Sequence, residues 1–251
     1  MGRLGDSGVP NSKRPATGNL LLAGLPQSLR RRLLARLEPV ELRLSEVLCK
    51  SGEHMRYAYF PTRSFVSLIA PLDRHAGLEV GLVGDEGMVG ISLMLGIEAA
   101  PLDALVQGAG GAWRMEAAML LGELSRSLPL RQVLSRYLYV TLTQLAQAGA
   151  CTRFHLVEAR LARWLLTTRD RAHADEFYIT HEYLSHMLGV RRAGITRAAV
   201  ALRKRNLIDY SRGLLTVIDG EGLERAACSC YATHNEHYTR VLGELETPGN
   251  Y

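Results

Sequence analysis

The sequence predicts an α+β protein in which a β-rich N-terminal half, a long helix and a largely helical C-terminal half follow one another. Short apolar runs separated by Gly, Pro and Asp fill residues 39–116, as in a rolled β-sheet. A helical repeat of apolar residues starts after Pro129, and residues 179–218 indicate two short helices followed by a hairpin. The 251 residues suffice for two domains of ordinary size.

Composition excludes several classes of protein. A chain with 47% hydrophobic and 22% charged residues is too apolar to be disordered. Four cysteines are too few for a disulfide scaffold, and their number suits a reducing, cytoplasmic location. Residues 1–18 lack the apolar segment of an export signal, so we expect a loose tail there. The uncharged stretch 137–152 is shorter than the ~20 residues of a membrane-spanning helix, so we expect no membrane association.

The N-terminal half begins as helix and continues as short strands. Asn19 is placed to cap a first helical turn, Pro26 resets the chain, and leucines recur at helical spacing up to Leu37. Glycine at every third position from Gly81 to Gly90 suits the turns of a rolled sheet better than a phosphate loop, because no Lys-Ser/Thr follows. We expect strands at Glu41–Leu48, Tyr57–Phe60, Phe65–Ile69, Leu78–Val83, Ala104–Gln107 and Ala112–Met115.

The helix over 129–150 carries an apolar repeat typical of helix pairing. Its members step by four, three, four and three, which is the a/d pattern of a coiled coil. Together with the uncharged stretch, the repeat predicts a dimerisation helix, although the same stripe could pack on the chain's own β domain. Gly149 is the predicted hinge before a further helix, Phe154–Leu166. The predicted dimer contacts are Leu134, Leu138, Thr141, Leu145 and Ala148.

Residues 179–218 carry the clearest functional pattern. Thr180 is placed to cap a helix that ends at Gly189, and a second helix runs from about Arg191 to Lys204. Two short helices joined at a glycine, the second basic on its free face, form a helix-turn-helix. The hairpin predicted after the second helix makes the unit a winged helix-turn-helix.

Positive charge is concentrated in this unit. Residues 151–212 hold 12 basic and six acidic side chains, an excess larger than the net charge of +5 of the whole chain. Within 187–212 the count is seven basic residues against Asp209 alone. A local basic patch on a balanced protein is the electrostatic signature of polyanion binding, so we expect double-stranded DNA as a partner.

Base reading is assigned to the start of the second helix. An arginine can donate two hydrogen bonds to guanine in the major groove, and Arg192 and Arg197 lie near the end of the helix that would enter it. Other side chains are placed for the DNA backbone. The predicted backbone contacts are Thr180, Arg191, Thr196, Lys204 and Arg212.

From Asn19 to Ile218 the chain resembles the cyclic-AMP receptor protein and fumarate-nitrate regulator (CRP/FNR) family. The resemblance is carried by Gly84-Asp-Glu-Gly87-Met-Val-Gly90, by Glu158-Ala-Arg-Leu-Ala and by the winged block Ile179–Ile218. It implies a cyclic-nucleotide-binding-like sensory domain and a dimer that regulates transcription on palindromic sites, with RNA polymerase as a further partner. The expected division is a tail (1–18), a sensory domain (19–128), a dimerisation helix (129–150) and a DNA-binding domain with a C-terminal helix (151–251).

The chain departs from the family at the effector pocket. Gly87-Met88 and Leu102-Asp103 stand where the family has Gly-Glu and Arg-Ser/Thr, so the ribose-binding Glu and the phosphate-binding Arg are missing. A buried phosphate without a cation is costly, so we expect no tight cyclic AMP binding and an unknown effector. The first cysteine is Cys49, which excludes the family's N-terminal iron–sulfur cluster. In the reading helix Ala193 replaces the family's Glu, so we expect a different DNA site.

A C-terminal motif and two other functions compete with this interpretation. Cys230, His234 and His237 share a helical face that could hold zinc or haem. The same stripe continues through Leu223, Ala227, Val241 and Leu245, which favours packing, so we expect no metal and no cofactor. A sensor module acting through Cys49 or Cys151, without DNA binding, is the alternative function. No nucleophile elbow, phosphate loop or catalytic carboxylate pair is present, so we do not expect an enzyme.

Overall fold

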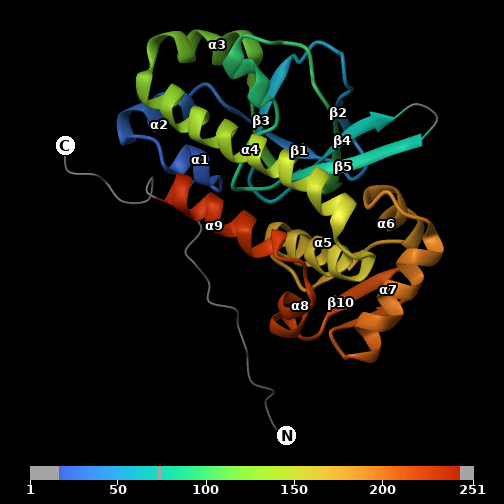
Figure 1. The fold of residues 1–251 in the computed structure, drawn as a ribbon. Helices are drawn as coiled ribbons and strands as arrows, with labels where there is room; N and C mark the ends of the chain where they lie inside the picture. Colours follow the sequence, from blue (N-terminus) through green and yellow to red (C-terminus); the bar gives the residue numbers. More distant parts are fainter. Residues whose placement is uncertain (1–16, 73–74, 244–251) are drawn as a thin grey trace, which may run out of the picture.

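The computed structural model describes residues 17–72 and 75–243. Figure 1 shows a β domain with three short helices at one end and a helical domain with a small sheet at the other. One long helix, α4 (Leu128–Phe154), runs from the first to the second. This is the α+β arrangement that the sequence predicts. Among the described residues no helix is long and apolar enough to cross a membrane.

The N-terminal helices α1 (Leu20–Ala23) and α2 (Gln27–Leu34) begin where the sequence predicts. Asn19 caps α1, because its Oδ1 accepts a hydrogen bond from the Leu22 amide. Its Nδ2 also donates to the carbonyls of Pro61 and Gly87, both at 2.9 Å, so the buried amide ties α1 to the sheet. Of the predicted tail, residues 1–16 lie outside the described residues, whereas Thr17 is buried.

Two antiparallel sheets form the β domain. One has the order β1-β7-β3 and the other the order β2-β6-β4-β5, and a short 3₁₀ helix, η1 (Ile91–Leu95), follows the glycine-rich turns. The predicted single strand Glu41–Leu48 is wrong: the chain breaks at Ser45, which adopts a φ of 65°, and so forms two strands in different sheets. The strands are β1 (Glu38–Leu42), β2 (Val47–Cys49), β3 (Tyr57–Pro61), β4 (Phe65–Leu72), β5 (His75–Val83), β6 (Asp103–Gly108) and β7 (Gly110–Glu116).

The glycine-rich segment is a set of turns, as expected. Gly87 closes a turn on the Gly84 carbonyl at 3.1 Å, and Gly90 has a φ of 96°. Gly87 also allows α4 to approach, because a Cβ atom at this position would lie 2.2 Å from the Tyr137 hydroxyl oxygen. The segment therefore serves contact between the sheet and the long helix.

The long helix differs from its prediction at both ends. Helix α3 (Ala117–Arg126), which the sequence analysis does not identify, precedes it, and Ser127 caps α4. The predicted hinge at Gly149 is wrong: α4 continues through it, since a single glycine costs a helix only about 1 kcal/mol. The chain turns instead at His155 and Leu156, whose ψ values of 144° and 149° are extended.

The C-terminal domain has its own core around α5 (Val157–Ala172). Its small sheet has the order β8-β10-β9, and β8 is an unpredicted strand. The remaining elements are β8 (Glu176–Tyr178), α6 (His181–Met187), α7 (Arg192–Lys204), β9 (Ile208–Ser211), β10 (Leu214–Val217), α8 (Gly220–Ala226) and α9 (Cys230–Leu242).

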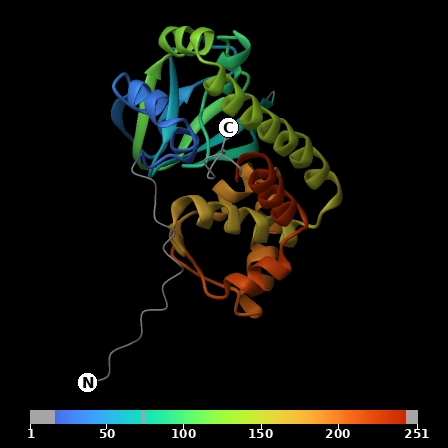
Figure 2. The same ribbon diagram turned by 90° about the vertical axis from the view of Figure 1, so that its left-hand side faces the viewer.

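Helix α9 leaves the C-terminal domain and lies along α4 (Figures 1 and 2). Leu242 joins the core of the β domain, and the Tyr238 hydroxyl donates to the Glu86 carbonyl at 2.7 Å. Val241 packs against the same core, as the predicted apolar stripe requires, while Leu245 lies outside the described residues. The last helix therefore holds the two domains together.

Helix α5 makes further contacts between the domains. The buried Arg171 guanidinium pairs with Glu86 at 2.8 Å and donates to the Leu82 carbonyl at 3.1 Å. The Trp164 indole donates to the Glu79 carboxyl at 2.8 Å. These contacts fix where the helix-turn-helix stands relative to the β domain.

Candidate nucleic-acid interface

Helices α6 and α7 form the predicted helix-turn-helix. The Thr180 hydroxyl accepts from the Tyr183 amide at 3.1 Å and caps α6, and Gly189, with a φ of 60°, makes the turn after it. Ile195 and Leu202 are fully buried on the inner face of α7. The opposite face of α7 is therefore open to solvent.

Five of the seven basic residues of 187–212 have no ion pair with any acidic side chain that the structure describes. Among the described residues, Arg203 pairs with Asp209 at 3.0 Å and Arg205 with Glu158 at 3.1 Å. The other five are exposed and have no ion pair within the described part of the chain. They are Arg191, Arg192, Arg197, Lys204 and Arg212.

The wing is a tight hairpin between β9 and β10. Leu214 pairs with Ser211, so only Arg212 and Gly213 form the turn, both in the left-handed region at φ values of 50° and 86°. This geometry presents Arg212 at the tip of the hairpin. Arg212 therefore adds a positive charge from the wing to the basic surface that α7 presents.

The two predicted threonine contacts already have partners within the chain. The Thr196 hydroxyl donates to the Arg192 carbonyl at 3.1 Å and lies 3.1 Å from His181 Nδ1. The His181 ring stacks on Tyr210 at 4.5 Å, and its pKa is lowered by burial and by the charge of Arg192. His181 thus links α6, α7 and the wing, a role that was not predicted from the sequence.

The residues of the predicted effector pocket have different surroundings. Met88 is buried in the core, and its carbonyl accepts from the Tyr137 hydroxyl at 3.4 Å. Asp103 accepts from the Ser51 amide at the start of β6, and Leu102 precedes it in sequence. Gly87 lies against the Tyr137 ring. Tyr137 of α4 therefore occupies the space beside Gly87 and Met88.

A cavity lies between β5, α4, α5 and α9. Its lining includes Leu82, Gln144, Arg163, Arg171 and His234. The pKa of His234 falls to about 3 because the ring is buried and faces Arg171 and Arg163. The imidazole is therefore neutral and lies within hydrogen-bonding distance of both Gln144 and Arg171, at 3.2 and 3.3 Å.

The predicted dimer stripe is divided by burial. Leu134 and Thr141 are buried by the chain itself and are unavailable to a partner, because α4 rests on the β domain through this face. Leu138, Leu145 and Ala148 are only half-buried. The large apolar side chains that α4 exposes lie on a neighbouring face: Leu128, Tyr139, Leu142 and Phe154.

Cys230, His234 and His237 are not a common ligand set. On α9, His234 faces Arg171 and Gln144, whereas the Cys230 sulfur lies 3.5 Å from His155 Nδ1. Cys151 and Cys228 complete a different group of possible ligands. The missed residue is His155, whose signal in the sequence is the four-residue spacing from Cys151 at the end of the uncharged helix.

Comparisons with known proteins agree with this architecture. Residues 159–226 match the family model of the Crp-like helix-turn-helix domain. No curated protein sequence matches the chain.

Three solved structures are similar over most of the chain. A crp/fnr-family protein from Eubacterium rectale has a TM-score of 0.66 at 17% identity, covering 83% of this chain and 98% of its own. The c-di-GMP responsive global regulator CLP from Xanthomonas campestris has a TM-score of 0.63 at 17% identity, covering 76% and 99%. A CRP-family transcriptional regulator from Thermus thermophilus has a TM-score of 0.63 at 18% identity, covering 75% and 96%. Because these identities are only 17–18%, the structural similarity establishes a shared fold and nothing further.

Proposed function

Residues 159–226 are a Crp-like helix-turn-helix domain in a chain with the fold of CRP/FNR transcriptional regulators, and on this basis we propose that the protein is a sequence-specific transcriptional regulator. It acts as a dimer on palindromic DNA. The observation that carries the proposal is the row of exposed arginines and lysine on α7 and the wing, which have no ion pair within the described residues. Five unneutralised charges on one surface favour a polyanion over a neutral ligand.

The two arginines on the first half of α7 read the bases. A helix fits the major groove, and a bidentate arginine–guanine contact contributes about 1–3 kcal/mol of discrimination. Arg192 and Arg197 are exposed there. Thr180, Arg191, Thr196, Lys204 and the wing-tip Arg212 contact phosphates and set the register. Because Ala193 cannot accept a hydrogen bond from a base, the preferred site differs from that of relatives with Glu at this position.

Dimerisation uses the face of α4 that the β domain leaves open. Tyr139, Leu142 and Phe154 are 50%, 56% and 77% exposed, and Ala146 and Gly149 lie on the same face with room for a close approach of a second helix. Half-buried Leu138, Leu145 and Ala148 border it. Two copies paired along α4 would present two reading helices, and twofold symmetry requires a palindromic site.

The effector is not cyclic AMP in this proposal. The buried Met88 and the absence of a cation at Leu102 leave no group for a cyclic phosphate. In this proposal the protein works in the cytoplasm and catalyses no reaction. It also contacts RNA polymerase, as the resemblance to the CRP/FNR family implies.

Selection of bound DNA from random sequence, followed by gel shifts, tests the proposal. We expect a palindromic consensus, and Arg192→Ala and Arg197→Ala should each lose about 1–3 kcal/mol of discrimination between that site and a mismatched one. Arg225→Ala is the matched control, because Arg225 lies on α8 near Asp219 and Glu221. Absence of any DNA binding would favour a sensor whose output is not DNA.

A single charge on α4 tests the dimer. Leu142→Glu should convert a micromolar sample from dimer to monomer in sedimentation, since a desolvated carboxylate would face its symmetry copy. Leu44→Glu, at a similarly exposed leucine between β1 and β2, should leave the dimer intact. A wild-type monomer, or equal loss in both variants, would contradict the assignment.

A further inference from the structure

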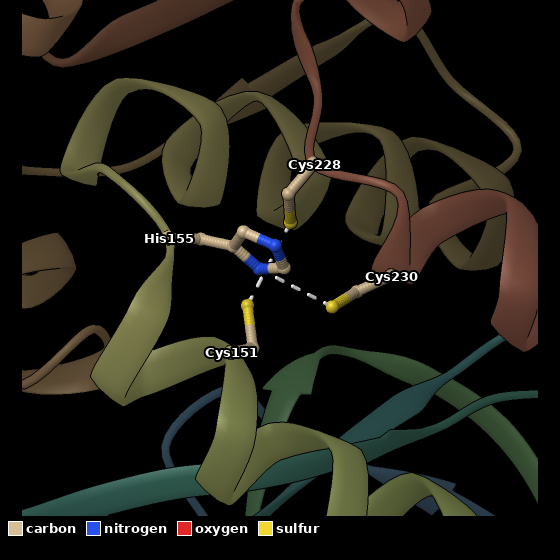
Figure 3. Close-up of side chains that lie close together, drawn as sticks. All are labelled: Cys151, His155, Cys228 and Cys230. Atoms are coloured by element: carbon tan, nitrogen blue, oxygen red, sulfur yellow. Dashed lines mark hydrogen bonds between the residues drawn. The ribbon is translucent and has the colours of Figure 1, made fainter.

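Four possible metal ligands meet where α4 ends and α9 begins. Cys151 lies in the last turn of α4, and His155 is the residue at which that helix ends. Cys228 precedes α9, and Cys230 is its first residue. Figure 3 shows the four side chains pointing toward one another from these two segments, which are distant in sequence. The fold alone brings them together.

Their spacing fits one small ion. The sulfurs of Cys151 and Cys228 are 3.6 Å apart, the Cys230 sulfur is 3.5 Å from His155 Nδ1, and all four ligand atoms lie within 4.8 Å of one another. In tetrahedral zinc, with bonds of about 2.3 Å to sulfur and about 2.05 Å to nitrogen, neighbouring sulfurs are about 3.8 Å apart and sulfur and nitrogen about 3.6 Å. The observed distance between the Cys151 and Cys228 sulfurs and that between the Cys230 sulfur and His155 Nδ1 are both close to these values.

The surroundings suit thiolate ligands. The three cysteines are buried, at 1%, 7% and 7% exposure. Arg160 and Arg163 face the cluster, and the Nε of each is buried without a hydrogen-bond partner among the described residues. Three thiolates and one Zn²⁺ leave a single negative charge, which the two arginines offset.

We propose that Cys151, His155, Cys228 and Cys230 bind one Zn²⁺ ion in a structural site. Three cysteines and one histidine are a common donor set of structural zinc, and four protein ligands leave no open position for catalysis. A cluster with two irons needs its ligand pairs further apart than this compact group allows.

The ion would fix the joint between the domains. The chain reverses direction at His155 and Leu156 to start α5, and α9 returns from the C-terminal domain to the β domain at Cys230. Zinc would link the turn after α4 to the start of α9. The position of the helix-turn-helix relative to α4 would therefore depend on the metal. The site is independent of the DNA-binding proposal, because metal content is measured without DNA.

Metal analysis of the full chain tests the site. The protein is purified without a histidine tag, under reducing conditions and without chelator, and we expect about one zinc per chain. Cys230→Ser and His155→Ala should lose most of it after dialysis against a weak chelator. Cys49→Ser should keep it, because this half-buried cysteine lies on β2, outside the group.

A second readout separates ligand loss from misfolding. Cobalt added to the metal-free, reduced chain should produce sulfur-to-cobalt charge-transfer absorption and the intense visible bands of tetrahedral Co²⁺. Cys228→Ser should weaken both while its far-ultraviolet circular dichroism stays like that of wild type. A reduced wild-type protein that contains no zinc and gives no cobalt spectrum would overturn the proposal, as would iron with acid-labile sulfide. A Cys151–Cys228 disulfide with no metal uptake after reduction would do the same.

Discussion

Two pairs of arginines in the C-terminal domain have opposite surroundings. Arg192 and Arg197 on α7 are exposed and have no ion pair among the described residues. Arg160 and Arg171 on α5 are 5% and 6% exposed, and each donates to a backbone carbonyl, of Leu188 and Leu82 respectively. One residue type thus lines the surface that we propose binds DNA and, at Arg171, also joins the two domains.

The difference shows that a count of charges does not by itself locate a binding surface. A buried guanidinium already has its partners inside the protein, and separating it from them leaves an uncompensated charge. Removal of an exposed guanidinium costs the protein little stability, and its effect is seen only in binding to an external partner. Stability measurements should therefore respond to one group and DNA binding to the other.

The largest expected effect is at Arg171. Arg171→Met should lower the free energy of unfolding by about 3–5 kcal/mol, because Glu86 would remain buried without its partner at 2.8 Å. Urea unfolding measures it. The double variant Arg171→Met/Glu86→Gln should regain part of the loss, and a single-variant loss below about 1 kcal/mol would mean that water reaches Glu86.

The next effect is a pH dependence at Glu79. Burial raises the pKa of this carboxyl from 4.5 to about 7, although Ser67, Trp164, Arg163 and Arg171 oppose the shift. The folded protein therefore keeps a proton that the unfolded chain has released, so this contribution is complete below about pH 4.5 and is lost as the pH rises to about 7.

Glu79→Gln isolates that contribution, because glutamine resembles the neutral acid and still accepts from the Trp164 indole. Relative to the variant, wild type should lose up to about 3 kcal/mol of unfolding free energy between pH 4 and pH 8. Thermal or urea unfolding across this range measures it. Parallel pH profiles for the two proteins would show that folding does not raise the pKa of Glu79.

The smallest effects belong to the exposed basic residues outside the base-reading pair. Lys204→Ala and Arg212→Ala should each change the unfolding free energy by no more than about 0.5 kcal/mol. Each should weaken binding to all DNA sequences alike and reduce the slope of log K against log salt concentration by about 1. A change in sequence preference in either variant would reassign that side chain to a base.

The apolar pattern of the long helix predicts the helix itself but not which of its faces meets a partner. The repeat correctly predicts a helix after Pro129, but α4 carries apolar residues around much of its circumference, among them Leu134, Tyr139, Leu142 and Leu145. Periodicity cannot distinguish the face that covers the β domain from a face left for a partner. Burial of Leu134 and exposure of Leu142 separate the two.

The group of Cys151, His155, Cys228 and Cys230 could not be found from sequence spacing, because its members lie on two segments that are distant in sequence. The sequence groups Cys230, His234 and His237 on one helical face, because positions i, i+4 and i+7 of a helix lie on the same side. Cys230 instead lies beside His155, on a segment that enters the joint from α4. No local pattern relates these two positions.

The order of elements, the capped helix-turn-helix with its wing and the concentration of positive charge there could all be predicted, because caps, turns and periodicity act over a few residues. It took the folded chain to show which arginines have no ion pair among the described residues, which face of α4 is free, and that Cys151, His155, Cys228 and Cys230 meet. Each of these depends on how α9 and α5 pack against α4 and the sheet, and such contacts join residues that no local rule relates.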